Sequence, residues 1–172
     1  MTFTEKLWNA CLETGLPELA TKTKWIQGIK NGNLDPDDYG KYSVQDVGYC
    51  YYARNNWIAA MEKTKEYDID IYNYCIDEVL SMTTFSESFA KDWHIQPSGI
   101  EFGGALEEYI NYEKYIIEHY EPSYFLCAMY ACYGLWPWTV QQIKPIAPNN
   151  LYQGKVRNNL KTKHIKRQYI HE

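Results

Sequence analysis

A carboxylate stands among tyrosines in the segment KYSVQDVGYCYYARNNW, residues 41–57. At helical spacing, Asp46 shares one stripe with Tyr42, Tyr49 and Ala53. Burying an unpaired carboxylate costs several kcal/mol. Asp46 must therefore either be satisfied by a neighbouring tyrosine hydroxyl or backbone amide, or meet a ligand, and the spacing leaves both interpretations open.

A second candidate for chemistry is a cysteine in the segment FLCAMYACYGLWPW, residues 125–138, which is apolar on nearly every side. Such a pattern predicts a central, buried helix, with Cys132 one turn before Trp136. A buried cysteine usually acts as a small hydrophobic side chain, whereas a nucleophilic thiolate needs surroundings that activate it. The sequence does not place a histidine base for it, so both interpretations stay open.

Two tyrosines share a helix face in the segment ALEEYINYEKY, residues 105–115. Tyr109 and Tyr112 lie on this face, while Glu107, Glu108 and Lys114 lie mostly on the other. Packing in the core is the simplest interpretation of the two rings.

Several other chemistries lack their sequence patterns. None of the four histidines has a glutamate three residues before it, as carboxylate-bridged metal bundles require. The five cysteines contain no CxxC pair, and the phosphate-binding GxxxxGK[ST] and GxGxxG and the nucleophile motif GxSxG are absent. We therefore expect no metal and no cofactor.

The composition is that of a globular protein. Of the 172 residues, 45% are hydrophobic, with 6 Trp and 17 Tyr, and this length fits one domain. Glu5 and Lys6 interrupt the stretch where a signal peptide would be apolar, and no run of 18 apolar residues occurs. We expect a cytoplasmic protein with no membrane association.

The net charge of −5 conceals a basic end. From Lys155 onward there are six Lys or Arg and one acid, which leaves 11 basic and 21 acidic residues, or −10, elsewhere. Only this end could contact nucleic acid, and Tyr169 is its only aromatic residue, so we expect a solvated tail and no nucleic-acid partner.

Helical periodicity without paired strand signals predicts an all-α protein. Asp35 and Pro36 have the residue types of an N-cap and a first helical position. Pro137 is expected to kink the helix that contains it, and one last, mostly polar helix is expected in residues 151–172. The other helices are expected at about residues 4–13, 16–30, 36–65, 69–93, 105–119 and 122–144.

Four motifs in the same order resemble the TenA/THI-4 (thiaminase II) family. They are WIQGIKNGNLDPDDYGKYSVQD, ALEEYINYEKY, AMYACYGLWPW and NNLYQ, and the resemblance covers residues 1–153. It implies a heme-oxygenase-like helical bundle that assembles as a homo-oligomer. The basic segment 154–172 falls outside it.

The resemblance also implies roles for individual residues. Asp46 matches the carboxylate that hydrogen-bonds the aminopyrimidine ring. Cys132 matches the nucleophile, which adds to the pyrimidine so that the group on its exocyclic methylene leaves and is replaced by water. Asp46 and Cys132 are thus the expected catalytic residues, and the expected substrate-binding residues are Tyr42, Tyr49, Tyr109 and Trp136.

The chain departs from the family pattern in ways that bear on activity. Trp136 stands where many members have a pocket tyrosine, and the family's catalytic glutamate near the C-terminus has no counterpart. Glu107, Glu108 or an acid from another subunit would have to replace it as proton donor. Two functions stay open: a thiaminase II-like hydrolase of weak activity acting on thiamine or an aminopyrimidine, and a non-catalytic binding or interaction protein with the same fold.

Overall fold

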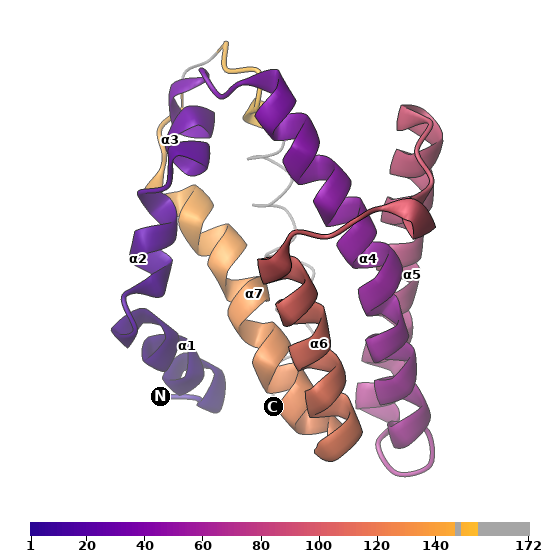
Figure 1. Cartoon of the computed structure of the whole chain (residues 1–172). Coiled ribbons are helices and arrows are strands. Elements are labelled where there is room, and N and C mark those ends of the chain that lie inside the picture. The colour runs from indigo at the N-terminus through magenta and orange to yellow at the C-terminus, as the bar shows by residue number, and fades with distance from the viewer. Residues whose placement is uncertain (147–148, 155–172) are drawn as a thin grey trace. The chain divides into compact units, whose positions relative to one another are not determined.

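The computed structural model describes residues 1–146 and 149–154. In these residues the chain forms seven α-helices and one 3-10 turn, with no strand, which confirms the all-α prediction (Figure 1). The elements are α1 (Phe3–Glu13), α2 (Leu16–Thr21), α3 (Lys24–Asn31), α4 (Pro36–Thr64), α5 (Ile69–Trp93), η1 (Pro97–Gly99), α6 (Gly104–His119) and α7 (Pro122–Gln142). Among the described residues, every helix is too short or too polar to span a lipid bilayer.

Short polar side chains begin the helices where the sequence predicts starts. At α4, Oδ1 of Asp35 accepts a hydrogen bond from the Asp37 amide at 2.9 Å, as expected of an N-cap. At α5, Asp68 accepts from the Ile71 amide at 3.0 Å. Because each cap satisfies a backbone donor that the helix leaves without a partner, the starts of both long helices are fixed locally.

One predicted helix, residues 16–30, is in fact two. The break falls at Thr23, whose backbone is extended and whose hydroxyl accepts from the Ile26 amide at 3.3 Å. The same hydroxyl donates to the Ala20 carbonyl oxygen at 2.9 Å, so one side chain ends α2 and begins α3. The prediction was wrong because apolar periodicity continues across a capping threonine.

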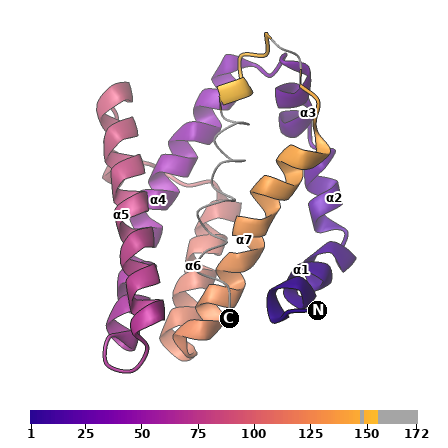
Figure 2. The same cartoon turned by 180° about the vertical axis from the view of Figure 1, so that it is seen from behind.

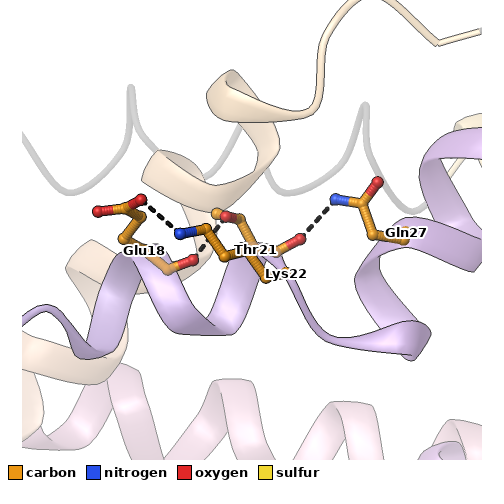
Figure 3. Close-up of polar contacts among 4 residues, drawn as sticks. All are labelled: Glu18, Thr21, Lys22 and Gln27. Carbon is orange, nitrogen blue, oxygen red and sulfur yellow. Dashed lines mark hydrogen bonds and ion pairs between the residues drawn. The ribbon is translucent and has the colours of Figure 1, made fainter.

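Figure 3 shows the polar contacts that hold this corner. The Gln27 side-chain amide of α3 donates to the Thr21 carbonyl oxygen at 2.6 Å. Within α2 the Thr21 hydroxyl donates to the Glu18 carbonyl oxygen at 2.7 Å, and Lys22 pairs with the Glu18 carboxylate at 2.7 Å. The corner is thus held by the Gln27 and Thr21 side chains, which donate to backbone carbonyl oxygens. The exposed ion pair between Lys22 and Glu18 adds little.

Two further expectations concern the later part of the chain. Helix α7 continues through Pro137 and ends at Gln142, two residues before the expected end. The last, polar helix is expected in residues 151–172, of which 155–172 lie outside the described residues.

The chain divides into two compact units, whose boundaries fall inside α4 and α7. The central unit is Tyr39–Leu126, and the terminal unit is Met1–Asp38 with the described residues from Cys127 onward. The expected domain of residues 1–153 stays a prediction.

In the terminal unit, aromatic rings join α1 and α3 to α7. The Trp8 and Trp138 rings meet edge to face, with centroids 6.3 Å apart. The NNLYQ motif closes this unit: the Asn150 side-chain amide donates to the carbonyl oxygens of Ile29, at 2.6 Å, and Lys30, at 3.2 Å. Asn150 therefore satisfies carbonyls at the C-terminal end of α3, which gives this motif a structural role.

In the central unit, α5 runs alongside α4, as Figures 1 and 2 show. The core here contains the fully buried rings of Trp57 and Phe125, whose centroids are 4.8 Å apart. Tyr74 of α5 meets Trp57 edge to face at 5.8 Å. These rings bury large apolar surfaces at the middle of the unit.

Helix α4 holds both ends of α6. The Gln45 side chain donates to the Glu101 carbonyl oxygen at 2.9 Å and accepts from the Gly103 amide at 3.0 Å, just before α6 begins. At the other end, the Lys63 ammonium donates to the carbonyl oxygens of Ile117 and Tyr120. Because Gln45 contacts the start of α6 and Lys63 contacts its end, the two helices run parallel. The 18 residues from Gln45 to Lys63 nearly match the 16 residues of α6, so these contacts also fix the register of the two helices.

Gly48 is required where α4 meets the segment before α6. A Cβ at this position would lie 2.7 Å from the Phe102 ring and 3.0 Å from Ile100. The Phe102 ring is itself held edge to face by Tyr52, with centroids 5.3 Å apart, so it has little freedom to move. A side chain at position 48 would therefore push the segment that precedes α6 away from α4.

We predict that Gly48→Ala lowers the free energy of unfolding by roughly 1–2 kcal/mol, because overpacking outweighs the gain in helix propensity. Gly40→Ala is the matched control on the same helix, since the nearest atom to its added carbon, in Trp93, is 3.7 Å away. It should be neutral or stabilising by up to ~1 kcal/mol. Urea denaturation measures both, and a Gly48→Ala variant at least as stable as Gly40→Ala would refute the close packing.

Candidate functional site

A fully buried carboxyl lies at the centre of the contact between α4 and α6. Glu113 of α6 has no exposed surface. The Tyr49 hydroxyl donates to its Oε1 at 2.7 Å, and the Asn56 side-chain amide donates to its Oε2 at 3.2 Å. The Tyr109 side chain hydrogen-bonds the same carboxyl. Each oxygen thus has a donor, which a buried carboxyl requires.

Helical spacing brings these four side chains together. Tyr49 and Asn56 are seven residues, or two turns, apart on α4, and Tyr109 and Glu113 are four residues apart on α6. The rings of Tyr49 and Tyr109 lie 5.8 Å apart between centroids, with their planes tilted by 31°. The register set by Gln45 and Lys63 therefore gives one cluster of two half-buried tyrosines that hydrogen-bond one buried acid.

The environment of Glu113 raises the pH at which its carboxyl releases a proton. Burial raises the pKa of its carboxyl to about 7, and the hydrogen bonds from Tyr49, Asn56 and Tyr109 oppose this rise. A carboxyl of such pKa can gain or lose a proton at neutral pH, as general acids and bases do. The cluster therefore combines aromatic surface with an exchangeable proton.

Four of the six predicted site residues lie in the central unit. The structure brings the rings of Tyr49 and Tyr109 into contact, and their substrate-binding role stays a prediction. Tyr42 and Asp46 are half-buried on α4, with Asp46 one turn before Tyr49. The catalytic role of Asp46 and the substrate-binding role of Tyr42 stay predictions.

The other two predicted residues, Cys132 and Trp136, lie on α7 in the terminal unit. Both are half-buried, and the Trp136 ring meets Trp25 edge to face with centroids 6.1 Å apart. The roles of Cys132 as nucleophile and of Trp136 as a substrate contact stay predictions.

A pocket of about 590 Å³ occurs in the terminal unit. Its lining includes Glu18, Gln27 and Lys30 from α2 and α3, together with Trp138 and Ile143. None of the six predicted site residues lines it, so the predicted site does not depend on this pocket.

Sequence reasoning missed Glu113. The acids considered as proton donors, Glu107 and Glu108, are both exposed, whereas Glu113 is buried. A signal was present, because Glu113 lies four residues after Tyr109 and three before the buried Ile116. The spacing argument that singled out Asp46 on α4 applies equally to Glu113 on α6.

Comparison with models of known protein families and with curated proteins finds no match to this chain. Within the residues that the structure describes, no group of three or more His, Cys, Asp or Glu side chains is arranged to hold a metal ion. The features of the chain that bear on function are therefore its motifs and the geometry of the cluster around Glu113.

We predict a pH dependence of stability that belongs to Glu113. Its pKa of about 7 in the folded protein is above the ordinary value of 4.5, so between these pH values the folded state holds a proton that the unfolded chain has released. The stability that Glu113 contributes is therefore fully present below pH 4.5 and falls as the pH rises to about 7.

Denaturation of the wild type and of Glu113→Gln across this range measures the effect. The wild type should lose roughly 3 kcal/mol relative to the variant between the two pH values. Glu118→Gln, at an exposed position of the same helix, is the control and should show no such relative change. A constant difference between wild type and Glu113→Gln would contradict the raised pKa.

Proposed function

We propose that this protein is a thiaminase II-like aminopyrimidine hydrolase with a heme-oxygenase-like fold, acting on thiamine or a related aminopyrimidine in thiamine salvage or degradation. The observation that carries the proposal is the pair of half-buried rings, Tyr49 and Tyr109, that contact each other, with the Tyr49 hydroxyl bound to the buried Glu113 carboxyl. Asp46 lies one turn from Tyr49 on the same helix. By the resemblance, Tyr49, Tyr109 and Asp46 each match a position that contacts the substrate in the family, whereas Glu113 does not.

The cluster suits a flat nitrogen heterocycle. Such a ring gains most from aromatic side chains beside it and from a few fixed polar groups in otherwise apolar surroundings. Because its hydroxyl is bound to Glu113 at 2.7 Å, the Tyr49 ring is held in place before a ligand arrives. The Asp46 carboxylate supplies an acceptor for an exocyclic amino group.

Hydrolysis also needs a nucleophile and a proton donor. In the proposed reaction the Cys132 sulfur adds to the pyrimidine, and the bond from the exocyclic methylene to its substituent breaks. Water then supplies the hydroxyl that replaces the substituent, and the sulfur leaves as a thiol. The amino group of an aminomethylpyrimidine must take up a proton to leave as ammonia, so its rate depends on an acid that can release one near neutral pH, whereas the thiazolium of thiamine leaves as a neutral thiazole without one.

A second candidate function is non-catalytic binding of the same ligands. The exposure of Glu107 and Glu108 favours it, because both acids expected to replace the family's C-terminal glutamate lie in water. Binding needs only Asp46 and the tyrosine rings, whereas turnover needs Cys132 and a proton donor as well.

Incubation with thiamine and with 4-amino-5-aminomethyl-2-methylpyrimidine, followed by mass spectrometry, tests the proposal. We expect the hydroxymethylpyrimidine product from wild type and its loss in Cys132→Ser. Cys127→Ser is the matched control, a half-buried cysteine on the same helix, and should keep the activity. Asp46→Asn should weaken binding about tenfold or more, as expected when a hydrogen bond to a charged group is lost.

Isothermal titration calorimetry separates the two candidate functions. Heat of binding without product would support the binder and contradict the hydrolase. If neither compound gives heat of binding or product, both candidate functions are contradicted.

A further inference from the structure

The pocket of the terminal unit has both an apolar and a polar lining. Its volume of about 590 Å³ is within the range of sites that hold a small organic molecule. The apolar side chains are Leu12, Trp138 and Ile143, and the polar ones come from α2, α3 and the end of α7. Such a lining suits a ligand with an apolar body and a polar end.

The Trp138 ring is held in place before a ligand arrives. Trp8 of α1 meets it edge to face, with centroids 6.3 Å apart. Trp8 can lie this close to α7 because Gly134, one turn before Trp138, has no side chain: a Cβ there would lie 2.6 Å from the Trp8 ring. The pocket therefore has one fixed aromatic surface, which favours a flat ring in the ligand.

The corner between α2 and α3 supplies fixed polar groups, as Figure 3 shows. The Gln27 side-chain NH₂ group donates to the Thr21 carbonyl oxygen at 2.6 Å, which sets the orientation of this amide. Its second N–H and its oxygen have no partner within the described chain. The Gln27 amide can therefore donate to a ligand or accept from one.

Lys30 places an ammonium group in the same lining, on a half-buried side chain. In the part of the chain that the structure describes, no carboxylate lies within ion-pair distance of it. The one acid of the lining, Glu18, is paired with Lys22 at 2.7 Å. The pocket thus has one positive charge that the described chain does not balance.

Lys30 is also not needed to complete its own helix. A lysine in the last turn often binds carbonyl oxygens that the helix leaves without partners. At the end of α3, however, the Asn150 side chain donates to the carbonyl oxygens of Ile29 and Lys30, and the Asn33 amide donates to that of Gly28. The Lys30 ammonium is therefore available to a ligand.

We propose that this pocket binds a small aromatic carboxylate, whose charged group pairs with Lys30 and whose ring lies against Trp138. One ammonium balances one negative charge, whereas a phosphate ester carries about −1.5 to −2 and would be repelled more strongly by Glu18. The side-chain amides of Gln27 and Gln142 donate to the carboxylate oxygens. The site shares no residue with the proposed aminopyrimidine site, so it does not rest on that function.

Isothermal titration calorimetry with 2-naphthoate tests the proposal, alongside two compounds with the same rings, 2-naphthalenemethanol and 2-naphthyl phosphate. We expect one equivalent of 2-naphthoate to bind. The neutral alcohol should bind about tenfold more weakly or worse, as expected when a hydrogen bond between charged groups is lost. The phosphate should bind no more tightly than 2-naphthoate. An alcohol of equal affinity, a phosphate of higher affinity, or no binding of 2-naphthoate would overturn the proposal.

Lys30→Met removes the ammonium and keeps most of the apolar stem. In this variant 2-naphthoate should bind about tenfold more weakly, while the alcohol keeps its wild-type Kd. Lys24→Met, at an exposed position of the same helix outside the lining, is the matched control and should keep both Kd values. Equal losses in the two variants would indicate general charge attraction and would refute the site.

Leu12→Trp locates the site independently of charge. The larger side chain fills the pocket from α1 and should abolish binding of both the carboxylate and the alcohol. Circular dichroism checks that this variant is folded, and if it is not, the comparison of Lys30→Met with Lys24→Met decides alone. Binding of 2-naphthoate that is unchanged in folded Leu12→Trp would place the ligand elsewhere and contradict the proposal.

Discussion

The burial of the Glu113 carboxyl between α4 and α6 is the constraint on which the central unit depends. A carboxyl without water is tolerated only where donors reach both of its oxygens. Tyr49 and Asn56 do so from α4, and Tyr109 adds a bond from α6 itself. These contacts specify which faces of the two helices meet, since rotation or sliding of either helix would leave the acid without its donors.

The rest of the unit maintains that register. Gln45 fixes the start of α6, Lys63 fixes its end, and the absence of a side chain at Gly48 lets the preceding segment approach α4 closely. The same contacts that stabilise the fold thus place two tyrosine rings 5.8 Å apart, with the Tyr49 hydroxyl bound to an acid that can exchange a proton. Removal of the Glu113 side chain would therefore change the structure and the chemistry of the cluster together. The conservative change Glu113→Gln is the informative one.

Much of the helical architecture follows from the sequence, because local signals determine it. Asp68 and the periodicity after it give α5 its observed bounds, and Asp35 begins α4 as expected. The break at Thr23 was missed because a threonine can either continue a helix or cap one, and only its backbone conformation distinguishes these. In general, what is local in sequence was predictable and what needs a partner helix was not.

The candidate site shows this difference most clearly. The spacing of Tyr109 and Glu113 on α6 was visible, but nothing local indicated that Tyr49 and Asn56 would face that acid from a segment 57 residues or more earlier in the chain. Asp46 stands out in the sequence because its tyrosine neighbours lie on its own helix. The partners of Glu113 come from two helices, so its burial became evident only from their packing.

The most direct test of the central claim is the protonation of Glu113 itself. Carbon-13 NMR of the side-chain carboxyl, assigned by comparison with Glu113→Gln, follows this titration in the folded protein. The buried and hydrogen-bonded site predicts a transition near pH 7, well above the ordinary glutamate value of 4.5. A Glu113 carboxyl that titrates near pH 4.5, as in water, would contradict the account.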